Sequence, residues 1–127
     1  GADLLGDQKM ELSGLYLAEL GASVLIGIDP KGSELWSHAL PKGVHRRPVE
    51  QIVAGNLTAS GPGQWLAPGP DGSVSVIAAD GKLLDQWQTG AVITGLATML
   101  VDKQAVLVVA STDQVGSSGT LEAWRVK

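Results

Sequence analysis

The chain has 127 residues, of which 44% are hydrophobic and 17% charged, and its formal net charge at pH 7 is −4. These values predict one globular domain with a substantial core. The mild acidity argues against nucleic acid as a partner, because phosphate binding needs a dense lysine and arginine surface. The chain has no cysteine, which excludes disulfides and thiolate metal sites. No apolar run approaches the roughly 20 residues that span a bilayer, so no membrane span is expected.

Glycine and proline, present in 17 and 6 copies, divide the chain into short segments. Short segments between frequent turn signals are typical of an all-β protein. From residue 21 onward the sequence repeats itself at an offset of 51, and six pairs in one register indicate an internal repeat. The pairs are Gly21 with Gly72, Ile26 with Ile77, Asp29 with Asp80, Lys31 with Lys82, Glu34 with Asp85 and Trp36 with Trp87.

The middle copy of the repeat divides into four short strands, separated by the turn sequences G-P-G, G-P-D-G and D-G. The expected strands are 49–57, 64–68, 73–79 and 82–88. In the third of them Val74 and Val76 alternate with Ser73 and Ser75, which places the two pairs on opposite faces of the sheet.

A third copy follows at an offset of 47, where residues 119–123 (G-T-L-E-A) correspond to residues 72–76 (G-S-V-S-V). Before it, residues 105–110 read A-V-L-V-V-A and are apolar at every position. Such a strand is expected to be covered on both faces, and its valines and the nearby glycines make a helix the weaker alternative.

Units of about 40 to 50 residues that each form a four-stranded meander are typical of β-propeller blades. Blades pack face to face, which accounts for a strand that is apolar on both sides. Trp36 and Trp87, near the fourth strands, are expected to act as wedges between blades because each buries a large area. We therefore predict an all-β, β-propeller-type fold of about three blades, at 2–45, 46–90 and 91–127, with the first and last blades partial.

Three stretches of the chain, 2–12, 72–84 and 119–126, resemble FG-GAP/VCBS repeats and the related PQQ-like propeller repeats. They read A-D-L-L-G-D-Q-K-M-E-L, G-S-V-S-V-I-A-A-D-G-K-L-L and G-T-L-E-A-W-R-V. Three blades are too few to close a ring, since propellers usually have about four to eight. The resemblance therefore implies an open array. We favour a part of a larger propeller, and the alternative is that copies of the chain assemble to complete one.

The resemblance also implies a calcium loop at Asp3, Asp7 and Glu11. In FG-GAP-like repeats the loop D-x-D-G-D-G-x-x-D/E binds calcium, because alternate carboxylates converge on a hard cation. Here Leu5 replaces the middle acid, and Lys9 adds a positive charge. We expect a relict turn with solvated acids, with weak calcium binding as the alternative, and no other cofactor.

The most basic stretch of this acidic chain is P-K-G-V-H-R-R-P, residues 41–48, in the connection between the first two blades. Function often resides in loops on a rigid scaffold, and two arginines suit a carboxylate or a phosphate. The ligand-binding candidates of this stretch are Lys42, His45, Arg46 and Arg47. The alternative, which we favour, is an ordinary solvated loop.

Two further loops, 69–72 and 112–119, are expected on the same side of the fold, where each joins a second strand to a third. They add Asp71 and Asp113 to the ligand-binding candidates. The second loop is longer than a tight hairpin needs, which fits either a binding loop or an ordinary surface loop, and we favour the ordinary loop.

Catalytic motifs are missing from the sequence. It contains no G-x-S-x-G, no H-E-x-x-H, no thiol and no complete dinucleotide-binding loop. We therefore expect a non-enzymatic interaction module that binds a protein or another ligand through its loops. The alternatives are a fragment of a quinoprotein or polysaccharide-acting enzyme, and a structural role in which exposed blade faces mediate self-association. The resemblance implies a bacterial, extracytoplasmic setting.

Overall fold

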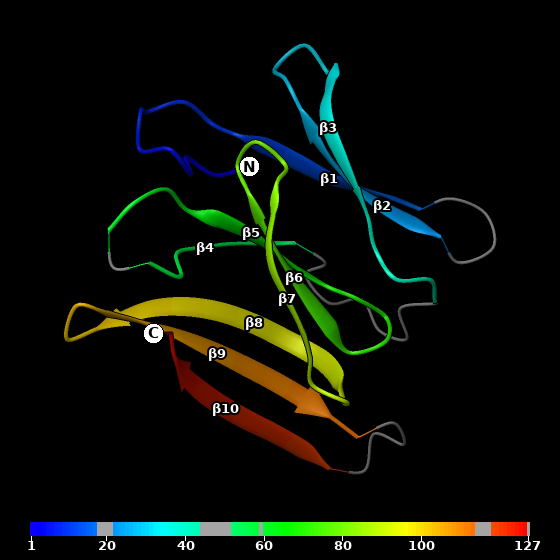
Figure 1. The fold of residues 1–127 in the computed structure, drawn as a ribbon, viewed down its shortest axis with the longest axis vertical. Helices are drawn as coiled ribbons and strands as arrows, with labels where there is room; N and C mark the ends of the chain where they lie inside the picture. Colours follow the sequence, from blue (N-terminus) through cyan, green and yellow to red (C-terminus); the bar gives the residue numbers. More distant parts are fainter. Residues whose placement is uncertain (18–21, 44–51, 59, 114–117, 127) are drawn as a thin grey trace.

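The computed structural model describes all residues except 18–21, 44–51, 59, 114–117 and 127. All regular elements in the described residues are strands, arranged as three antiparallel sheets (Figure 1). The first sheet contains β1 (Leu12–Leu17), β2 (Ser23–Ile28) and β3 (Glu34–Ala39). The second contains β4 (Val53–Gly55), β5 (Gln64–Pro68), β6 (Ser73–Ala78) and β7 (Leu83–Gln88). The third contains β8 (Val92–Val101), β9 (Gln104–Thr112) and β10 (Gly119–Arg125).

Each sheet is a simple meander in which neighbours in sequence are neighbours in the sheet. The sheets are open and blade-like, with four strands in the middle sheet and three in each outer one, which confirms the all-β prediction. Within the described ranges, no helix is long and apolar enough to cross a membrane.

The three sheets are stacked (Figure 1). Two clusters of hydrophobic side chains lie between them. The cluster between the first and second sheets consists of Leu4, Leu25, Leu40, Trp65, Ala67 and Ile77. The cluster between the second and third consists of Leu66, Val74, Val76, Ile93, Leu107 and Val109. The middle sheet is therefore covered on both faces, and burial of these apolar side chains is the main force that holds the stack together.

Strand β6 shows the predicted alternation. Val74 and Val76 belong to the cluster on the side of the third sheet, whereas Ile77 belongs to the cluster on the side of the first. Ser73 and Ser75, on the same face as Ile77, are buried as well. Residues 105–110 form part of β9, as predicted, and do not form a helix.

Three of the connections form the same tight turn, in which the first residue both accepts and donates a backbone hydrogen bond. Its carbonyl accepts from the fourth residue and its amide donates to the carbonyl of the fifth. The three turns are 29–33, 69–73 and 78–82. The fourth position is occupied by Gly32, Gly72 and Gly81, with φ of +87°, +81° and +89°. A positive φ at this position follows from a type I turn that ends in a glycine bulge, so glycine is favoured there.

These turns correct the predicted repeat offset. Superposition of the β2–β3 turn on the β6–β7 turn places Asp29 on Ala78 and Gly32 on Gly81, an offset of 49. The predicted offset of 51, which equated Asp29 with Asp80, is therefore wrong at this hairpin. The two aspartates look equivalent in the sequence because the side chain of aspartate can accept a hydrogen bond from a backbone amide at more than one position of a turn. Asp29 Oδ1 accepts from Lys31 at 2.8 Å as the first turn residue, whereas Asp80 Oδ1 accepts from Lys82 at 3.1 Å as the third.

The offset of 49 means that Trp36 and Trp87 are not equivalent in register, yet both lie between sheets as predicted. The Trp36 indole donates a hydrogen bond of 3.0 Å to the Ala79 carbonyl of the second sheet. The Trp87 ring lies 6.2 Å from that of Trp124 in the third sheet, tilted by 55°. Tilted aromatic pairs at this separation are attractive.

Candidate functional site

The predicted calcium loop is closed by one of its own carboxylates. Asp3 Oδ1 accepts hydrogen bonds from the amides of Gly6 at 2.7 Å and Asp7 at 3.1 Å. Asp3 Oδ2 accepts from the amide of Gln8 at 2.9 Å. Both oxygens of this side chain are thus already used to hold the backbone of the loop.

A loop in the equivalent position precedes β5 in the second sheet. Ala2 pairs with Glu11 just before β1, and Gly55 pairs with Gln64 at the start of β5. The Ala2–Glu11 bridge stands before β1 as the Gly55–Gln64 pair stands at the start of β5, and β1 then pairs with β2 as β5 pairs with β6. The loops that precede β1 and β5 are therefore structurally equivalent.

The two loops contain equivalent hydrogen bonds. Glu11 Oε2 accepts from the Leu4 amide at 2.6 Å, and Gln64 Oε1 accepts from the Leu57 amide at 2.8 Å. Leu4 and Leu57 pack into the first and second hydrophobic clusters. A neutral glutamine fills the position that the glutamate occupies, so the shared role of this side chain is to anchor a leucine and requires no charge.

The structure does not gather Asp3, Asp7 and Glu11 into one donor set. Within the described part of the chain, no group of three or more His, Cys, Asp or Glu side chains is placed to hold a metal ion. Asp7 instead accepts from the amide of Lys9 at 3.0 Å, and the ammonium of that lysine lies 3.8 Å from its other oxygen. Weak calcium binding here stays a prediction.

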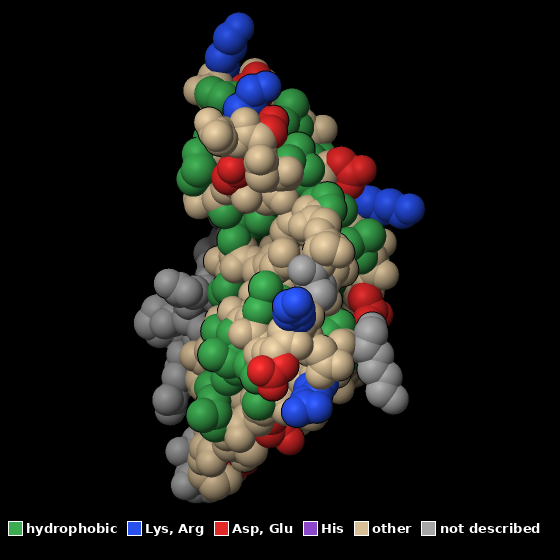
Figure 2. Space-filling view, turned by 90° about the vertical axis from the view of Figure 1, so that its left-hand side faces the viewer, with side chains coloured by type: hydrophobic (Ala, Val, Ile, Leu, Met, Phe, Trp, Pro, Cys, Tyr) green, Lys and Arg blue, Asp and Glu red, His purple; other side chains and the backbone are tan. Residues whose placement is uncertain are grey.

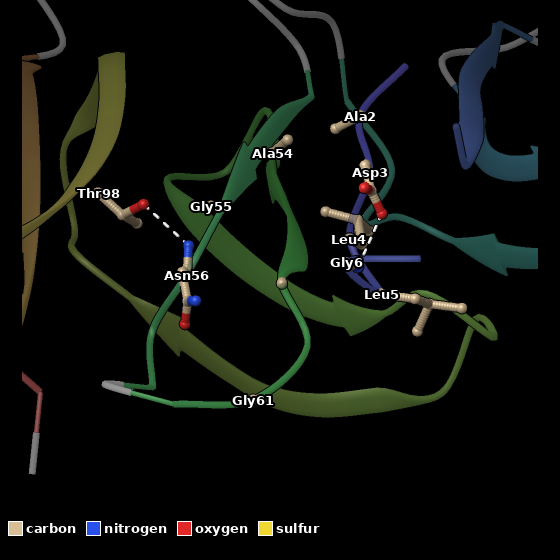
Figure 3. A pocket seen from close by; sticks show the side chains of 11 residues that line it. Ala2, Asp3, Leu4, Leu5, Gly6, Ala54, Gly55, Asn56, Gly61 and Thr98 are labelled. Carbon is tan, nitrogen blue, oxygen red and sulfur yellow. Dashed lines mark hydrogen bonds between the residues drawn. The ribbon is translucent and has the colours of Figure 1, made fainter. Parts of the chain in front are cut away.

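A cavity of about 460 Å³ opens between these two loops and β8 (Figure 3). Its lining comprises residues 2–6, residues 54–56, Gly61, Gly63 and Thr98. The amide of Asn56 donates to Thr98 Oγ1 at 2.9 Å, and the Asn56 side-chain oxygen accepts from the amide of Thr58. Most polar atoms of the cavity wall are therefore engaged in holding the loops.

A second hollow, of about 310 Å³, lies at the opposite end of the strands, on the side where sequence analysis placed the ligand-binding loops. We call it the groove. Its lining consists of Pro41, Asp71, Ser73, Gln86, Trp87 and Gln88. Lys42 follows Pro41 directly and is exposed, and a Cβ on Gly43 would lie 2.8 Å from Pro70. The structure thus brings the start of the basic stretch against the turn that carries Asp71.

Asp71 keeps its charge at neutral pH. Partial burial raises the pKa of its carboxyl group, but hydrogen bonding from Ser73 lowers it, and the net direction is below the ordinary value of 3.8. The Ser73 amide donates to Asp71 Oδ1 at 3.0 Å. A fixed, ionised carboxylate therefore stands at one wall of the groove.

The remaining predicted ligand residues do not line the groove. Asp113 closes its own loop, because its amide donates to the Ser118 carbonyl and the Ser118 hydroxyl donates to its carboxylate, both at 3.2 Å. His45, Arg46 and Arg47 lie outside the described residues. For all four, ligand binding stays a prediction.

Sequence reasoning missed two groove residues, Gln86 and Gln88. They alternate along β7, so they project from the same face of the middle sheet. That alternation was visible in the sequence, but nothing in the sequence showed that Pro41, from the first sheet, lies opposite them.

No family model matches the chain, and no curated protein matches it. Among solved structures, the chain is similar to a protein of unknown function from Bacteroides caccae, with 15% sequence identity and a TM-score of 0.45. The match covers 95% of this chain and 43% of that protein, so the chain spans less than half of its length.

Proposed function

We propose that the chain is a non-enzymatic binding module of the β-propeller type, and that a segment of a partner polypeptide enters the groove. The groove is the observation that carries the proposal. It combines one residue that sequence analysis selected for ligand binding, Asp71, with the side chains of a second strand and the end of the first sheet. A volume of about 310 Å³ lies at the lower end of the range for ligand pockets, roughly 300–1,000 Å³, which suits one or two side chains.

The groove presents hydrogen-bond acceptors. Gln86 Nε2 donates to Ser75 Oγ and Gln88 Nε2 donates to the Asp71 carbonyl, each at 3.2 Å. With their nitrogens engaged, both glutamines offer their amide oxygens to a ligand, beside the Asp71 carboxylate. Such a set suits N–H donors, which a peptide backbone and a lysine or arginine side chain supply. The net charge of −4 favours the approach of a cationic partner.

The residues of the groove support binding rather than catalysis. Its lining contains no histidine, cysteine or lysine, the side chains that most often act as general base or nucleophile at neutral pH. Of the two histidines in the chain, His38 lies in β3. The stack of three meanders supports the propeller-type architecture, in which loops at one end of the strands commonly bind ligands.

Small capped amino acids test this proposal by NMR. The probes are the N-acetyl amides of arginine, glutamine and glutamate, titrated into the isotope-labelled chain. We expect the arginine probe to shift the backbone amides of residues 71–73 and 86–88 most, and the glutamate probe least. No shift at the groove, or shifts confined to the cavity beside Thr98, would overturn the proposal.

Asp71→Asn supplies the matched variant, because asparagine keeps an oxygen for the Ser73 amide and removes only the charge. It is expected to weaken the shifts caused by the arginine probe. Asp102→Asn, in the β8–β9 turn at the other end of the strands, removes the same charge and is expected to leave them unchanged.

A further inference from the structure

The third sheet ends the stack with an apolar face whose residues on β8 and β10 are exposed. Leu107 and Val109 of β9 point to the second sheet, so the alternate residues of β9 and their partners in register form the opposite face. We call it the outer face of the third sheet. Its members include Ala97, Met99, Val108, Ala110, Leu121, Ala123 and Arg125. Leu121 is 73% exposed and Met99 is 52% exposed. Figure 2, a view from the side, shows hydrophobic side chains at the surface in the lower half of the molecule, where Figure 1 places the third sheet.

The middle sheet shows what such a face does when it is covered. Strands β6 and β10 are both third strands, and the offset of 47 places Val74 on Leu121 and Val76 on Ala123. Val74 and Val76 are 0% and 3% exposed because the third sheet packs on them. The equivalent residues of β10 are exposed, although their type suits the same packing.

The first sheet ends the stack at its other side in the same way. In β2, Ser23, Leu25 and Gly27 are buried, and Leu25 belongs to the cluster shared with the second sheet. The alternate residues of the strand therefore point away from the stack. We call this surface the outer face of the first sheet, and it includes Leu12, Gly14, Val24, Ile26, Ile28, Glu34, Ser37 and Ala39. A sheet face that stays exposed at the end of a stacked array is normally polar, whereas the residues named on these two faces are mostly apolar.

We propose that the outer face of the third sheet docks onto the outer face of the first sheet of a second copy of this chain. This contact repeats the face-to-face packing of successive sheets that already occurs twice in the chain, between the first and second sheets and between the second and third. The occupant is a second copy because each copy carries both faces, and both are apolar with one charge each among the residues named. Two copies of three sheets each fall within the range of about four to eight blades at which propellers close.

The two charges on these faces are complementary. Arg125 is the last residue of β10, and Glu34 is the first of β3. With the offset of 47, Arg125 corresponds to Ala78, the first residue of the β6–β7 turn. Glu34 directly follows the β2–β3 turn, which has the same hydrogen bonds as the β6–β7 turn. Both charges thus lie at the same end of their sheets, so a repeat of the packing between successive sheets places them at the same end of the new interface. Neither makes an ion pair within the described part of the chain.

Light scattering on a size-exclusion column, over a range of concentrations, tests the proposal. We expect a dimer or a larger head-to-tail oligomer. Leu121→Glu places a charge on the outer face of the third sheet, and Ser37→Glu does so on that of the first; each is expected to abolish association. Both positions are exposed, so the chain is expected to stay folded. Leu84→Glu, at a leucine 51% exposed on the middle sheet, is the control and is expected to associate like the unmodified chain.

A mixing experiment distinguishes this contact from a symmetric one. The Leu121→Glu chain keeps its first face, and the Ser37→Glu chain keeps its third, so an equimolar mixture is expected to form a one-to-one dimer while each alone is monomeric. Likewise, Arg125→Glu and Glu34→Arg are each expected to weaken association, and their combination in one chain to restore it. A monomer at all concentrations, association that survives Leu121→Glu, or a mixture that stays monomeric would overturn the proposal. The test does not involve the groove, so its outcome is independent of the proposed ligand binding.

Discussion

The indole Nε1 of Trp36 donates a hydrogen bond of 3.0 Å to the carbonyl oxygen of Ala79, which joins the outer strand of the first sheet to the β6–β7 turn of the second. The ring fills space that glycine leaves free on both sheets. A Cβ would lie 2.2 Å from the ring if added to Gly27 and 2.4 Å if added to Gly81. The turn is therefore part of the interface between sheets as well as a connection between strands.

Gly81→Ala is expected to destabilise the fold by about 3 kcal/mol. A positive φ costs an alanine about 1 kcal/mol, and displacement of a packed tryptophan adds roughly 1–3 kcal/mol. Urea denaturation measures the loss. Gly32→Ala is the matched control, because Gly32 has the same turn position, φ of +87° and nothing within 4 Å of an added Cβ. It is expected to cost only the backbone contribution of about 1 kcal/mol, and equal losses at the two glycines would contradict the role of the Trp36 contact.

Glu11→Gln is expected to leave the stability nearly unchanged, within about 0.5 kcal/mol, because glutamine makes the equivalent hydrogen bond at Gln64. Glu11→Ala removes the acceptor for the Leu4 amide and is expected to cost about 1–2 kcal/mol. Thermal and urea denaturation compare the two variants. If Glu11→Gln were as damaging as Glu11→Ala, the charge of this side chain would be essential and the equivalence with Gln64 would fail.

The same pair of variants bears on calcium. Each is expected to respond to about 1 mM calcium as the unmodified chain does, because Glu11 serves the Leu4 amide and both Asp3 oxygens serve the loop backbone. A rise in melting temperature that calcium gives to the unmodified chain and not to Glu11→Gln would establish Glu11 as a ligand.

Asp71 is expected to contribute to the pH dependence of stability. Its pKa is lowered in the folded state, so the unfolded chain binds more protons near the ordinary value of 3.8. The contribution is therefore fully present above that pH and is lost as the pH falls through the lower, folded-state pKa. Asp71→Asn is expected to flatten the fall in unfolding free energy below about pH 4. Urea midpoints measured from neutral pH to pH 3 check this, and identical slopes for both chains would contradict it.

Three of the four strands of the middle sheet were predictable because glycine, proline and aspartate mark their ends. The expected strand 49–57 is found as β4 over Val53–Gly55 only, and residues 49–51 lie outside the described residues. The expected strand 64–68 coincides with β5, and 73–79 and 82–88 each differ from β6 and β7 by one residue. The repeat register was not predictable in the same way. Asp29 and Asp80 share a neighbouring lysine but stand at different positions of the same turn, and only the backbone hydrogen bonds reveal this.

The groove could be predicted only in part. The turn chemistry of G-P-D-G placed Asp71 in a loop, and alternation in β7 placed Gln86 and Gln88 on one face. Pro41, which also lines the groove, follows β3 of the first sheet. Its position therefore depends on how the hydrophobic cluster around Trp65 and Leu25 packs the first sheet against the second. No local pattern in the sequence encodes that arrangement.

The β8–β9 hairpin offers a stabilising change. Asp102 and Lys103 form its two-residue turn with φ of +50° and +64°, the left-handed pair that a type I′ turn requires. Lysine is strained there, whereas glycine in the second position is preferred. Lys103→Gly is therefore expected to raise the free energy of unfolding by about 1 kcal/mol. Lys31→Gly is the matched control, because Lys31 is an exposed turn lysine outside the positive-φ residues. It is expected to lower stability by about 0.5 kcal/mol, the entropic cost of glycine. A stabilising effect of equal size at both lysines would show that loss of charge in this chain, and not relief of the turn, is responsible.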